Sequence, residues 1–393
     1  MKITESVILS ETKNLMLSMR YKTLHFVQGD TSRTFARASK VKSLKLKVRI
    51  KIFYYLLFTF HFSLFTFLCA CTSQKEKIYR KSRILMDTLV TITVVSNSEA
   101  SAEKAIDAAF SEVEKLEKLS NFFSSGSEVS RINRNAGISG VKVSPDISDV
   151  LEKALLVSEK TEGAFDVTMG PVIKLYDFYK KIKPEQGTIK KNLSLVNYRK
   201  LIIDRNKSTA YLEEKGMLID LGGISKGYAA DKAVETLKRN GISSGLVAVA
   251  GDIKAFGLKP DKRPWKIGIR NPRIPPDPKG GFPDDIMATI ELKDMAISTS
   301  GDYERCFILD GKRYHHLLSP KTGYPAEECR SVSIITKEGV FTDAFATGVF
   351  ILGPEKGMKV LEKMGFDGVI VDSQGKVFTT PGIRGKIEFK KTP

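Results

Sequence analysis

Residues 220–231 read DLGGISKGYAAD, and we expect the rest of the chain to be organised around this stretch. An apolar run over 217–219 precedes it and the apolar positions of 229–237 recur at helical spacing, which predicts a strand, a glycine turn and the start of a helix. The glycines would let the backbone approach a ligand closely, and amide groups at the helix start can bind phosphate oxygens. Lys226 adds a cation there. Because a glycine-rich turn alone is a weak signal, an ordinary strand-to-helix connection is the alternative.

A second stretch, FTDAFATGVFILG at 341–353, complements the first. Asp343 and Thr347 lie four residues apart, so a helix would place their side chains on one face. A carboxylate and a hydroxyl without a nearby His or Cys suit magnesium, which prefers oxygen ligands and usually keeps waters and substrate phosphates in its coordination shell. In the alternative, Thr342 caps the helix and Asp343 is a first-turn acid that the helix dipole favours.

The composition is that of a globular protein and does not favour nucleic-acid binding. The chain has 393 residues, 42% of them hydrophobic, and a formal net charge of +18. Residues 1–71 contain 12 Lys and Arg against three acidic residues, so half of the excess charge lies there. The rest of the chain has no basic block interleaved with aromatic residues, and we therefore expect no nucleic-acid partner.

The N-terminal charge is typical of an export signal. A basic run over 40–51 precedes an apolar stretch over 52–70, and Leu68-Cys69-Ala70-Cys71 ends the segment. This ending resembles a bacterial lipobox, in which the last cysteine, here Cys71, is lipidated and becomes the mature N-terminus. We therefore expect a lipid-anchored protein of the cell membrane that faces the periplasm, with the inner membrane as its expected site. An uncleaved transmembrane anchor is the alternative, because the apolar stretch is long enough to span a bilayer.

The chain divides into four segments on these grounds. We expect an unassigned extension, a signal peptide with a lipobox, a polar tether and one folded domain, over 1–39, 40–71, 72–83 and 84–393 respectively. Within the folded domain, Cys306 and Cys329 could pair in an oxidising periplasm or remain inert thiols.

Strands and helices mix in the folded domain without strict βαβ alternation, so we expect an α+β fold. Asp166 lies between apolar neighbours in a loop, and a half-buried acid there needs backbone amides or a polar ligand as partners. Two adjacent aromatic residues, Phe122 and Phe123, could serve as packing anchors or stack on a flat cofactor. The expected helices cover 99–119 and 145–161, and the expected strands lie at 83–95, in two parts within 245–257, at 265–270 and at 288–297.

With these motifs in order along the chain, the sequence resembles the ApbE family of flavin transferases, which move FMN from FAD onto a protein. The resemblance covers residues 84–376, about three quarters of the chain. Each motif alone is weak, but their order and spacing together are specific. They are Met86-Asp87-Thr88, SRIN at 130–133, GAFD at 163–166, DLGGISKGYAAD at 220–231, STSG at 298–301, His316 ahead of Pro320, and Thr342-Asp343 with Thr347.

The resemblance implies a single mixed α/β catalytic domain that uses FAD as substrate and Mg²⁺ as cofactor. It places the metal on Asp343, Thr347 and the backbone carbonyl of Gly223. Besides Asp343, the expected catalytic residue is His316, because an unperturbed His titrates near neutral pH and could act as general base. A structural histidine beside His315 is the alternative. The FAD site would fall on Met86, Phe122 or Phe123, Ala164, Phe165, Asp166, Asp220, Lys226 and Leu318.

Two positions depart from the family's pattern. The family's loop usually carries one aromatic residue, often Tyr, where this chain has Phe122 and Phe123. The family often has an acid before the proline at position 320, where this chain has Ser319. The second change would weaken a hydrogen bond near the site without removing a ligand.

The reaction that the resemblance implies is attack by a threonine hydroxyl of an acceptor protein on the FMN-side phosphorus of FAD, with release of AMP. The acceptor would be an exported or membrane redox protein, such as a subunit of a membrane redox complex, with a short flavinylation motif that contains the threonine. Two alternatives are a periplasmic FAD pyrophosphatase, in which water is the nucleophile, and a non-catalytic flavin-binding lipoprotein. The intact pair of Asp343 and Thr347 argues against the last.

Overall fold

The computed structural model describes residues 44–57, 75–272 and 286–390. The chain forms two units, Met1–Ser73 and Gln74–Pro393. In the first unit a helix over 44–57 is described, and its side chains are mostly exposed. No helix in the described ranges is both long and apolar enough to span a bilayer. Cys71, the lipobox and the extension at 1–39 lie outside the described residues, as does most of the expected signal peptide at 40–71.

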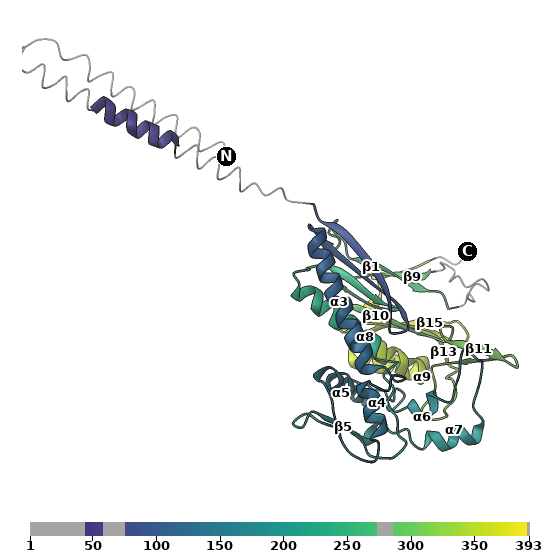
Figure 1. Ribbon diagram of the computed structural model, residues 1–393. Coiled ribbons are helices and arrows are strands. Elements are labelled where there is room, and N and C mark those ends of the chain that lie inside the picture. Colours follow the sequence, from purple (N-terminus) through teal and green to yellow (C-terminus); the bar gives the residue numbers. More distant parts are fainter. Residues whose placement is uncertain (1–43, 58–74, 273–285, 391–393) are drawn as a thin grey trace, which may run out of the picture. The chain divides into compact units, whose positions relative to one another are not determined.

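The second unit contains an eight-stranded sheet (Figure 1). All neighbouring strands in it are antiparallel, and with the helices described below this confirms the predicted α+β fold. In order across the sheet, the strands are β1 (Lys77–Leu85), β2 (Thr88–Ser96), β6 (Gly245–Val249), β7 (Asp252–Phe256), β10 (Ala296–Gly301), β13 (Cys329–Thr336), β14 (Asp367–Asp372) and β15 (Val377–Thr379).

Helices cover one face of this sheet and a smaller sheet covers the other. Helix α3 (Glu99–Ser120) packs on β1 and β2, α8 (Ser225–Arg239) on β6 and β7, and α9 (Gly339–Met364) on β10, β13 and β14. Because side chains alternate along a strand, Val332 and Ile334 of β13 lie in the core beneath the helices, whereas Ile335 lies in the core of the opposite face. That opposite core is closed by β16 (Ile387–Phe389), β9 (Ile286–Leu292) and β8 (Trp265–Arg270), in that order.

Shorter elements complete the unit. A third sheet, in the order β3-β5-β4, lies against α4 and α5, and β11 with β12 forms a separate hairpin. Cys306 in β11 and Cys329 in β13 are both free thiols. The bounds are α4 (Glu128–Arg134), β3 (Val141–Lys142), α5 (Pro145–Lys160), α6 (Gly170–Ile173), α7 (Gln186–Leu193), β4 (Leu201–Asp204), β5 (Thr209–Leu212), β11 (Cys306–Leu309) and β12 (Lys312–His315), with 3-10 turns at Tyr198–Lys200 and Pro381–Ile383.

Several predicted elements are confirmed, but two predicted strands each contain a turn and parts of two strands. The helices expected at 99–119 and 145–161 are α3 and α5, and the strands expected within 245–257 and at 265–270 are β6, β7 and β8. The stretch 83–95 instead contains the end of β1 and most of β2, because Met86 and Asp87 adopt left-handed φ angles of 54° and 55° and reverse the chain. The stretch 288–297 is divided between β9 and β10, which belong to different sheets, and Asp294 between them has a φ of 54°.

Residues 77–83, which we expected to belong to the tether, lie in a strand. Strand β1 begins at Lys77 and pairs with β2 over its whole length. It is an edge strand whose side chains are largely exposed, and charged residues at an edge oppose pairing with another chain. This exposure gives an ordered strand the composition of a linker, which is why sequence alone assigns it to the tether.

The run 217–219 before the glycine turn is not a strand. It contains only an isolated bridge between Leu218 and Met169. The Asn133 side chain instead satisfies the backbone of Ile219: its amide donates to the Ile219 carbonyl at 3.0 Å, and its oxygen accepts from the Ile219 amide at 2.7 Å. A side chain of α4 therefore fixes the entry to the glycine turn in the way that a neighbouring strand otherwise would.

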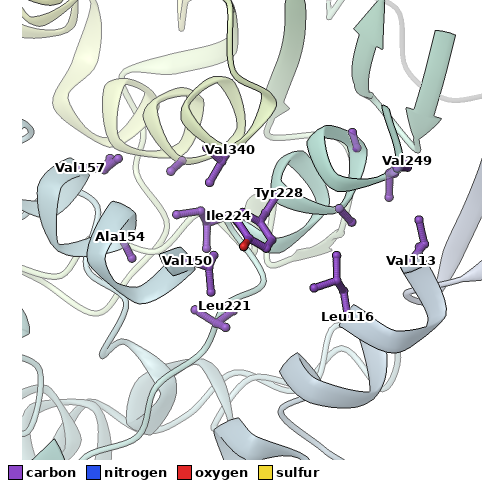
Figure 2. Packing of buried hydrophobic residues seen from close by; sticks show 14 of the residues in the cluster. Val113, Leu116, Val150, Ala154, Val157, Leu221, Ile224, Tyr228, Val249 and Val340 are labelled. Atoms are coloured by element: carbon purple, nitrogen blue, oxygen red, sulfur yellow. The ribbon is translucent and has the colours of Figure 1, made fainter. Parts of the chain in front are cut away.

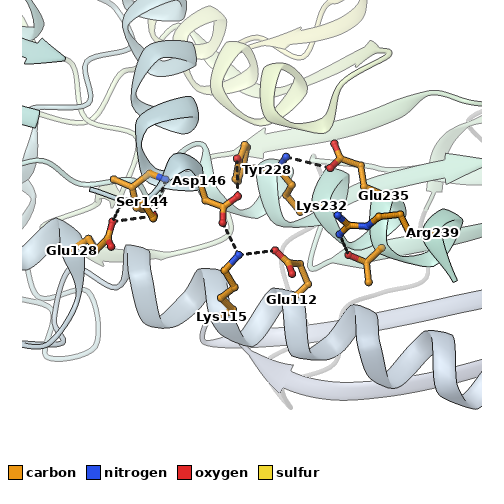
Figure 3. Close-up of polar contacts among 11 residues, drawn as sticks. Glu112, Lys115, Glu128, Ser144, Asp146, Tyr228, Lys232, Glu235 and Arg239 are labelled. Atoms are coloured by element: carbon orange, nitrogen blue, oxygen red, sulfur yellow. Dashed lines mark hydrogen bonds and ion pairs between the residues drawn. The ribbon is translucent and has the colours of Figure 1, made fainter. Parts of the chain in front are cut away.

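The start of α8 is packed between α3, α5 and α9. Figure 2 shows this cluster, in which Leu221, Ile224 and Tyr228 lie between residues of the three other helices, Val113, Leu116, Val150, Ala154, Val157 and Val340. Polar contacts also link these helices at the edge of the cluster (Figure 3). Lys115 of α3 bridges Glu112 at 3.2 Å and Asp146 of α5 at 2.7 Å, and Asp146 accepts a hydrogen bond from the Tyr228 hydroxyl at 3.4 Å.

Helices α8 and α9 cross at a pair of glycines. A Cβ on Gly227 would lie 2.0 Å from the carbonyl oxygen of Gly339, and a Cβ on Gly339 would lie 2.7 Å from the carbonyl oxygen of Gly227. Asp231 of α8 accepts hydrogen bonds from the amides of Gly339 and Val340 at 2.8 and 2.9 Å, so one helix caps the N-terminus of the other. Backbone contact and the cap together fix the relative position of the two helices.

We predict that Gly227→Ala destabilises the protein, because the added methyl group meets backbone that cannot move aside. The expected loss is about 1–3 kcal/mol in the free energy of unfolding, measured by urea titration of the purified chain. The matched control is Gly187→Ala in α7, where a Cβ meets nothing within 4 Å. This control should be neutral or stabilising by no more than about 1 kcal/mol. Equal unfolding midpoints for the two variants would show that the helices do not need the close approach.

Candidate active site

An ammonium group lies between two buried carboxylates at the start of α8. Lys226 Nζ is 2.7 Å from Asp252 Oδ2 and 3.3 and 3.4 Å from the two carboxylate oxygens of Asp343. Only 5% of Asp252 and 4% of Asp343 is exposed. Burial alone would lower the pKa of Lys226, but the two carboxylates outweigh it and raise that pKa above its usual value. Lys226 is therefore charged at neutral pH and compensates the buried negative charge.

Asp343 belongs to the interior of its helix. Its Oδ2 accepts a hydrogen bond at 3.0 Å from the amide of Gly227, in the first turn of α8. Burial and the neighbouring Asp252 raise the pKa of the Asp343 carboxyl, while Lys226 and the Gly227 amide act in the opposite direction. The alternative of an exposed first-turn acid capped by Thr342 is wrong. The N-cap is Glu338, and the Thr342 hydroxyl donates to the Gly339 carbonyl inside α9.

Groups from three elements come together at Thr347, in the helix that carries Asp343. Thr347 follows one helical turn later, and Ser300 Oγ of β10 is 3.4 Å from Thr347 Oγ1. Gly223 approaches the same hydroxyl, since a Cβ built on it would lie 3.4 Å from Thr347 Oγ1. Within the described ranges no cluster of three or more His, Cys, Asp and Glu could hold a metal, so a metal here would depend on hydroxyl and carbonyl oxygens together with Asp343. Such an all-oxygen donor set fits magnesium.

The two adjacent histidines have different environments. His315 Nε2 lies 2.9 Å from the Ala326 carbonyl, and its ring packs edge-on against Phe350. His316 Nδ1 is buried and has no hydrogen-bond partner among the described residues. Burial, followed by the charges of His315, Arg305 and Lys226, lowers the pKa of His316 to about 3. His316 is therefore a neutral imidazole whose Nδ1 has no protein partner among the described residues, whereas His315, whose ring has partners, fits a structural role.

The GAFD segment contacts the glycine turn through Phe165. A Cβ on Gly223 would lie 3.4 Å from Phe165 Cε2, and the Phe165 amide donates to Thr161 Oγ1 at 3.1 Å. Ala164 is buried next to it. The carboxylate of Asp166 accepts hydrogen bonds from the amide and hydroxyl of Thr168 at 2.8 and 2.6 Å and from the Tyr198 amide at 3.0 Å. Asp166 thus has the backbone partners that its burial requires.

The other predicted FAD residues lie at the margin of this cluster or apart from it. Asp220 Oδ1 accepts from the Gly222 amide at 2.8 Å, and burial raises the pKa of its carboxyl although Gly222 and Arg305 oppose the change. Leu318 packs in a separate apolar cluster with Met169. Within the described part of the chain, three residues make no hydrogen bond or ring contact with the Lys226 cluster: Met86, Phe122 and Phe123.

Those three residues gather instead around the end of α3. The Met86 amide donates to Glu117 Oε1 at 2.9 Å, and the Phe122 carbonyl accepts from the Ser130 hydroxyl at 3.0 Å. Phe122 and Phe123 stack edge to face with ring centroids 5.1 Å apart, and Phe123 is 82% exposed. Of the two rings, Phe123 is the one that a flat ligand could cover.

Sequence reasoning missed three residues that shape the site. They are Asp252, which pairs with Lys226; Ser300, which contacts Thr347; and Asp231, which caps α9. Each acts across a long interval of sequence, and no local periodicity encodes such a contact. The only sequence signals were the Gly251-Asp252 turn, the STSG motif and the final residue of DLGGISKGYAAD.

Comparisons with known proteins agree in sequence and in structure. The profile of the ApbE family matches residues 86–370. The FAD:protein FMN transferase of Treponema pallidum is 31% identical over 327 residues, which cover 79% of this chain and 88% of the relative. The FAD:protein FMN transferase of Haemophilus influenzae is 32% identical over 279 residues, which cover 69% of this chain and 78% of the relative. The crystal structure of an ApbE protein from Thermotoga maritima superposes with a TM-score of 0.73 at 31% identity, covering 79% of this chain and 99% of its own. Apo Pseudomonas stutzeri flavinyl transferase ApbE gives 0.69 at 29% identity, covering 79% and 97%.

We predict that Asp166→Ala destabilises the protein in the absence of any ligand, because it leaves buried amides of Thr168 and Tyr198 without an acceptor. The expected loss is about 1–3 kcal/mol in the free energy of unfolding, measured by urea titration. Asp177→Ala is the matched control. Asp177 also accepts two backbone hydrogen bonds, from Tyr179 and Lys180, but the amides that donate them belong to exposed residues. It should change the free energy of unfolding by no more than about 0.5 kcal/mol, and a comparable loss in both variants would contradict the prediction.

Proposed function

Because this chain belongs to the ApbE family, we propose that it is an FAD:protein FMN transferase that uses Mg²⁺ to move FMN from FAD to a threonine of another protein, with release of AMP. The observation that carries the proposal is the convergence of the glycine turn and α9, which brings Lys226, Asp343, Thr347 and Gly223 to one place. Two segments more than a hundred residues apart contribute a cation and an oxygen donor set to the same point. A cation and a bound metal would both stabilise the negative charge of a phosphoanhydride substrate.

The residues of the site have separable roles in this proposal. Asp343, Thr347 and the Gly223 carbonyl would hold magnesium, which when bound offsets the charge that develops on phosphate oxygens. Lys226 supplies a fixed positive charge to the phosphates of FAD. The buried carboxylates and the short helix crossing hold these groups in place before substrate arrives, so little reorganisation is needed during the reaction.

His316 would take the proton from the attacking hydroxyl. The acceptor oxygen forms a bond to the FMN-side phosphorus, the anhydride bond to AMP breaks, and the hydroxyl proton passes to the imidazole. A neutral imidazole has one unprotonated ring nitrogen that can accept that proton. Its low pKa in the free protein has burial and neighbouring cations as its causes, and the negative phosphates of FAD would raise this pKa on binding.

The proposed acceptor is an exported or membrane redox protein with a short motif that contains the threonine. Water is the competing nucleophile at far higher concentration, and a docked hydroxyl competes because positioning provides effective molarities on the order of 10⁵ M or more. If the site does not dock an acceptor, the same chemistry makes the protein an FAD pyrophosphatase. If it binds FAD without turnover, the protein is a flavin carrier.

We also propose that the chain is a lipoprotein anchored through Cys71, facing the periplasm from the inner membrane. The support is the basic run, the apolar stretch and the Leu68-Cys69-Ala70-Cys71 ending. A lipid anchor would keep the transferase at the surface where membrane redox acceptors are found.

The transferase proposal predicts a covalent flavin on the acceptor. The purified chain, FAD, Mg²⁺ and an acceptor domain with the threonine motif are mixed and denatured, and the acceptor band is examined for flavin fluorescence. Fluorescence should appear with wild type and disappear when the motif threonine is replaced by alanine or when Asp343→Asn removes the proposed metal ligand. Free FMN and AMP with an unlabelled acceptor, across several candidate acceptors, would favour the pyrophosphatase. Absence of any FAD turnover would favour the carrier.

The lipoprotein proposal predicts that radiolabelled palmitate enters the wild-type chain in cells and does not enter Cys71→Ala. Cys69→Ala is the control, because it changes the neighbouring cysteine without removing the proposed attachment site. Equal labelling of wild type and Cys71→Ala would rule out attachment at this residue.

A further inference from the structure

The two carboxylates that flank Lys226 are not equivalent partners. Lys226 Nζ forms a short contact of 2.7 Å with Asp252 Oδ2, whereas its distances to both oxygens of Asp343 are 3.3 and 3.4 Å. Asp343 has a second partner, because its Oδ2 also accepts from the Gly227 amide at 3.0 Å. The ammonium group is therefore held mainly by Asp252 and lies at the outer limit of hydrogen bonding to Asp343.

The position of Asp252 is fixed by the sheet. It is the first residue of β7 and follows a tight turn in which Ala250 adopts a φ of 54° and Val249 pairs with Asp252. Two residues later on the same side of the strand, Lys254 Nζ is 3.2 Å from Asp231 of α8. Strand β7 thus contacts α8 through two ion pairs of opposite polarity, Asp252 with Lys226 and Lys254 with Asp231. These contacts fix the Asp252 carboxylate, while Lys226 has a long side chain that could turn to either acid.

A metal cation and Lys226 would compete for Asp343. Two cations cannot both occupy the space next to one carboxylate without strong repulsion in a buried environment. If Asp252 lost its charge, Asp343 would be the one remaining carboxylate in contact with Lys226, and the ammonium group would move onto it. The present contacts of 3.3 and 3.4 Å would shorten to a close ion pair, which would occupy the oxygens that the metal needs.

We propose that Asp252 is a positioning residue that limits how closely Lys226 approaches Asp343 and so keeps the Asp343 carboxylate available to a divalent cation. This inference rests on the magnesium site of the proposed function and adds to it a residue that is not itself a ligand. Asp252 keeps Lys226 in the site as a cation for substrate phosphates and prevents it from blocking the metal. Both effects follow from one short ion pair.

The test measures metal binding directly, without turnover. Mn²⁺ replaces Mg²⁺, and free Mn²⁺ is followed by electron paramagnetic resonance during titration of the full chain without FAD. In the wild-type background, Asp252→Asn should weaken Mn²⁺ binding about tenfold or more. In a Lys226→Met background, where no ammonium group can move, the same substitution should weaken binding by no more than about threefold. The coupling between the two residues is the expected signature.

A simple loss of negative charge predicts a different pattern. In that case Asp252→Asn would weaken binding by the same factor in both backgrounds, and this result would overturn the proposal, as would no effect in either. Glu304→Gln is the matched control. The charges of Lys226 and Asp252 act on Glu304 electrostatically. The ion pair of Glu304 is with Arg270, at 3.8 Å, and not with Lys226. It should change Mn²⁺ binding by no more than about twofold.

Folding and the underlying metal site are checked in the same series. Circular dichroism and thermal unfolding confirm that each variant is folded, and Asp252→Ser replaces the Asn variant if the latter is recovered unfolded. Asp343→Asn should abolish the tight Mn²⁺ binding of wild type. If Asp343→Asn still binds Mn²⁺ tightly, or if wild type binds no Mn²⁺, both the metal site of the proposed function and the role of Asp252 are wrong. If Asp343→Asn abolishes binding but the two backgrounds behave alike, only the role of Asp252 is wrong.

Discussion

The close crossing of α8 and α9 is the constraint on which the rest of the site depends. Gly227 and Gly339 allow the two backbones to meet at a distance that any side chain would prevent, and Asp231 caps α9 from α8. Because of this approach, the Gly227 amide reaches the Asp343 carboxylate, and Lys226, one residue earlier, lies beside it. A lysine and an aspartate 117 residues apart in sequence therefore form one electrostatic unit.

The sheet also holds this pair of residues in place, through side chains of two of its strands. Strand β7 contributes Asp252 to Lys226, and β10 contributes Ser300 to Thr347 and Ser298 to Thr342. These polar contacts lie on the face of the sheet that the helices cover, between apolar residues that exclude water. Low dielectric surroundings make each of the charges more effective and also make each one costly without its partner. The stability of the helix layer and the electrostatics of the site are therefore consequences of the same packing.

Sequence reasoning recovered the features that local chemistry encodes. Helical spacing located α3 and α5, and the alternation in 265–270 located β8. The motifs at 220–231 and 341–353 were correctly paired, because a glycine turn with a lysine and a helix with an acid and a hydroxyl have complementary chemistry. The failures have physical causes. Two turns were overlooked because Met86, Asp87 and Asp294 adopt left-handed φ angles that glycine usually occupies, and β1 was assigned to the tether because an edge strand exposes its charges. The roles of Asp252, Asp231 and Asn133 are tertiary contacts, which no local pattern specifies.

In the proposed function, the glycine turn and α9 together hold a divalent cation at the helix crossing. The most direct measurement is anomalous diffraction from crystals of the protein grown with FAD and Mn²⁺. We expect a Mn²⁺ peak within coordination distance of Asp343, Thr347 Oγ1 and the Gly223 carbonyl oxygen, in contact with the FAD phosphates. A peak at another place, or bound FAD without Mn²⁺ at these residues, would contradict it.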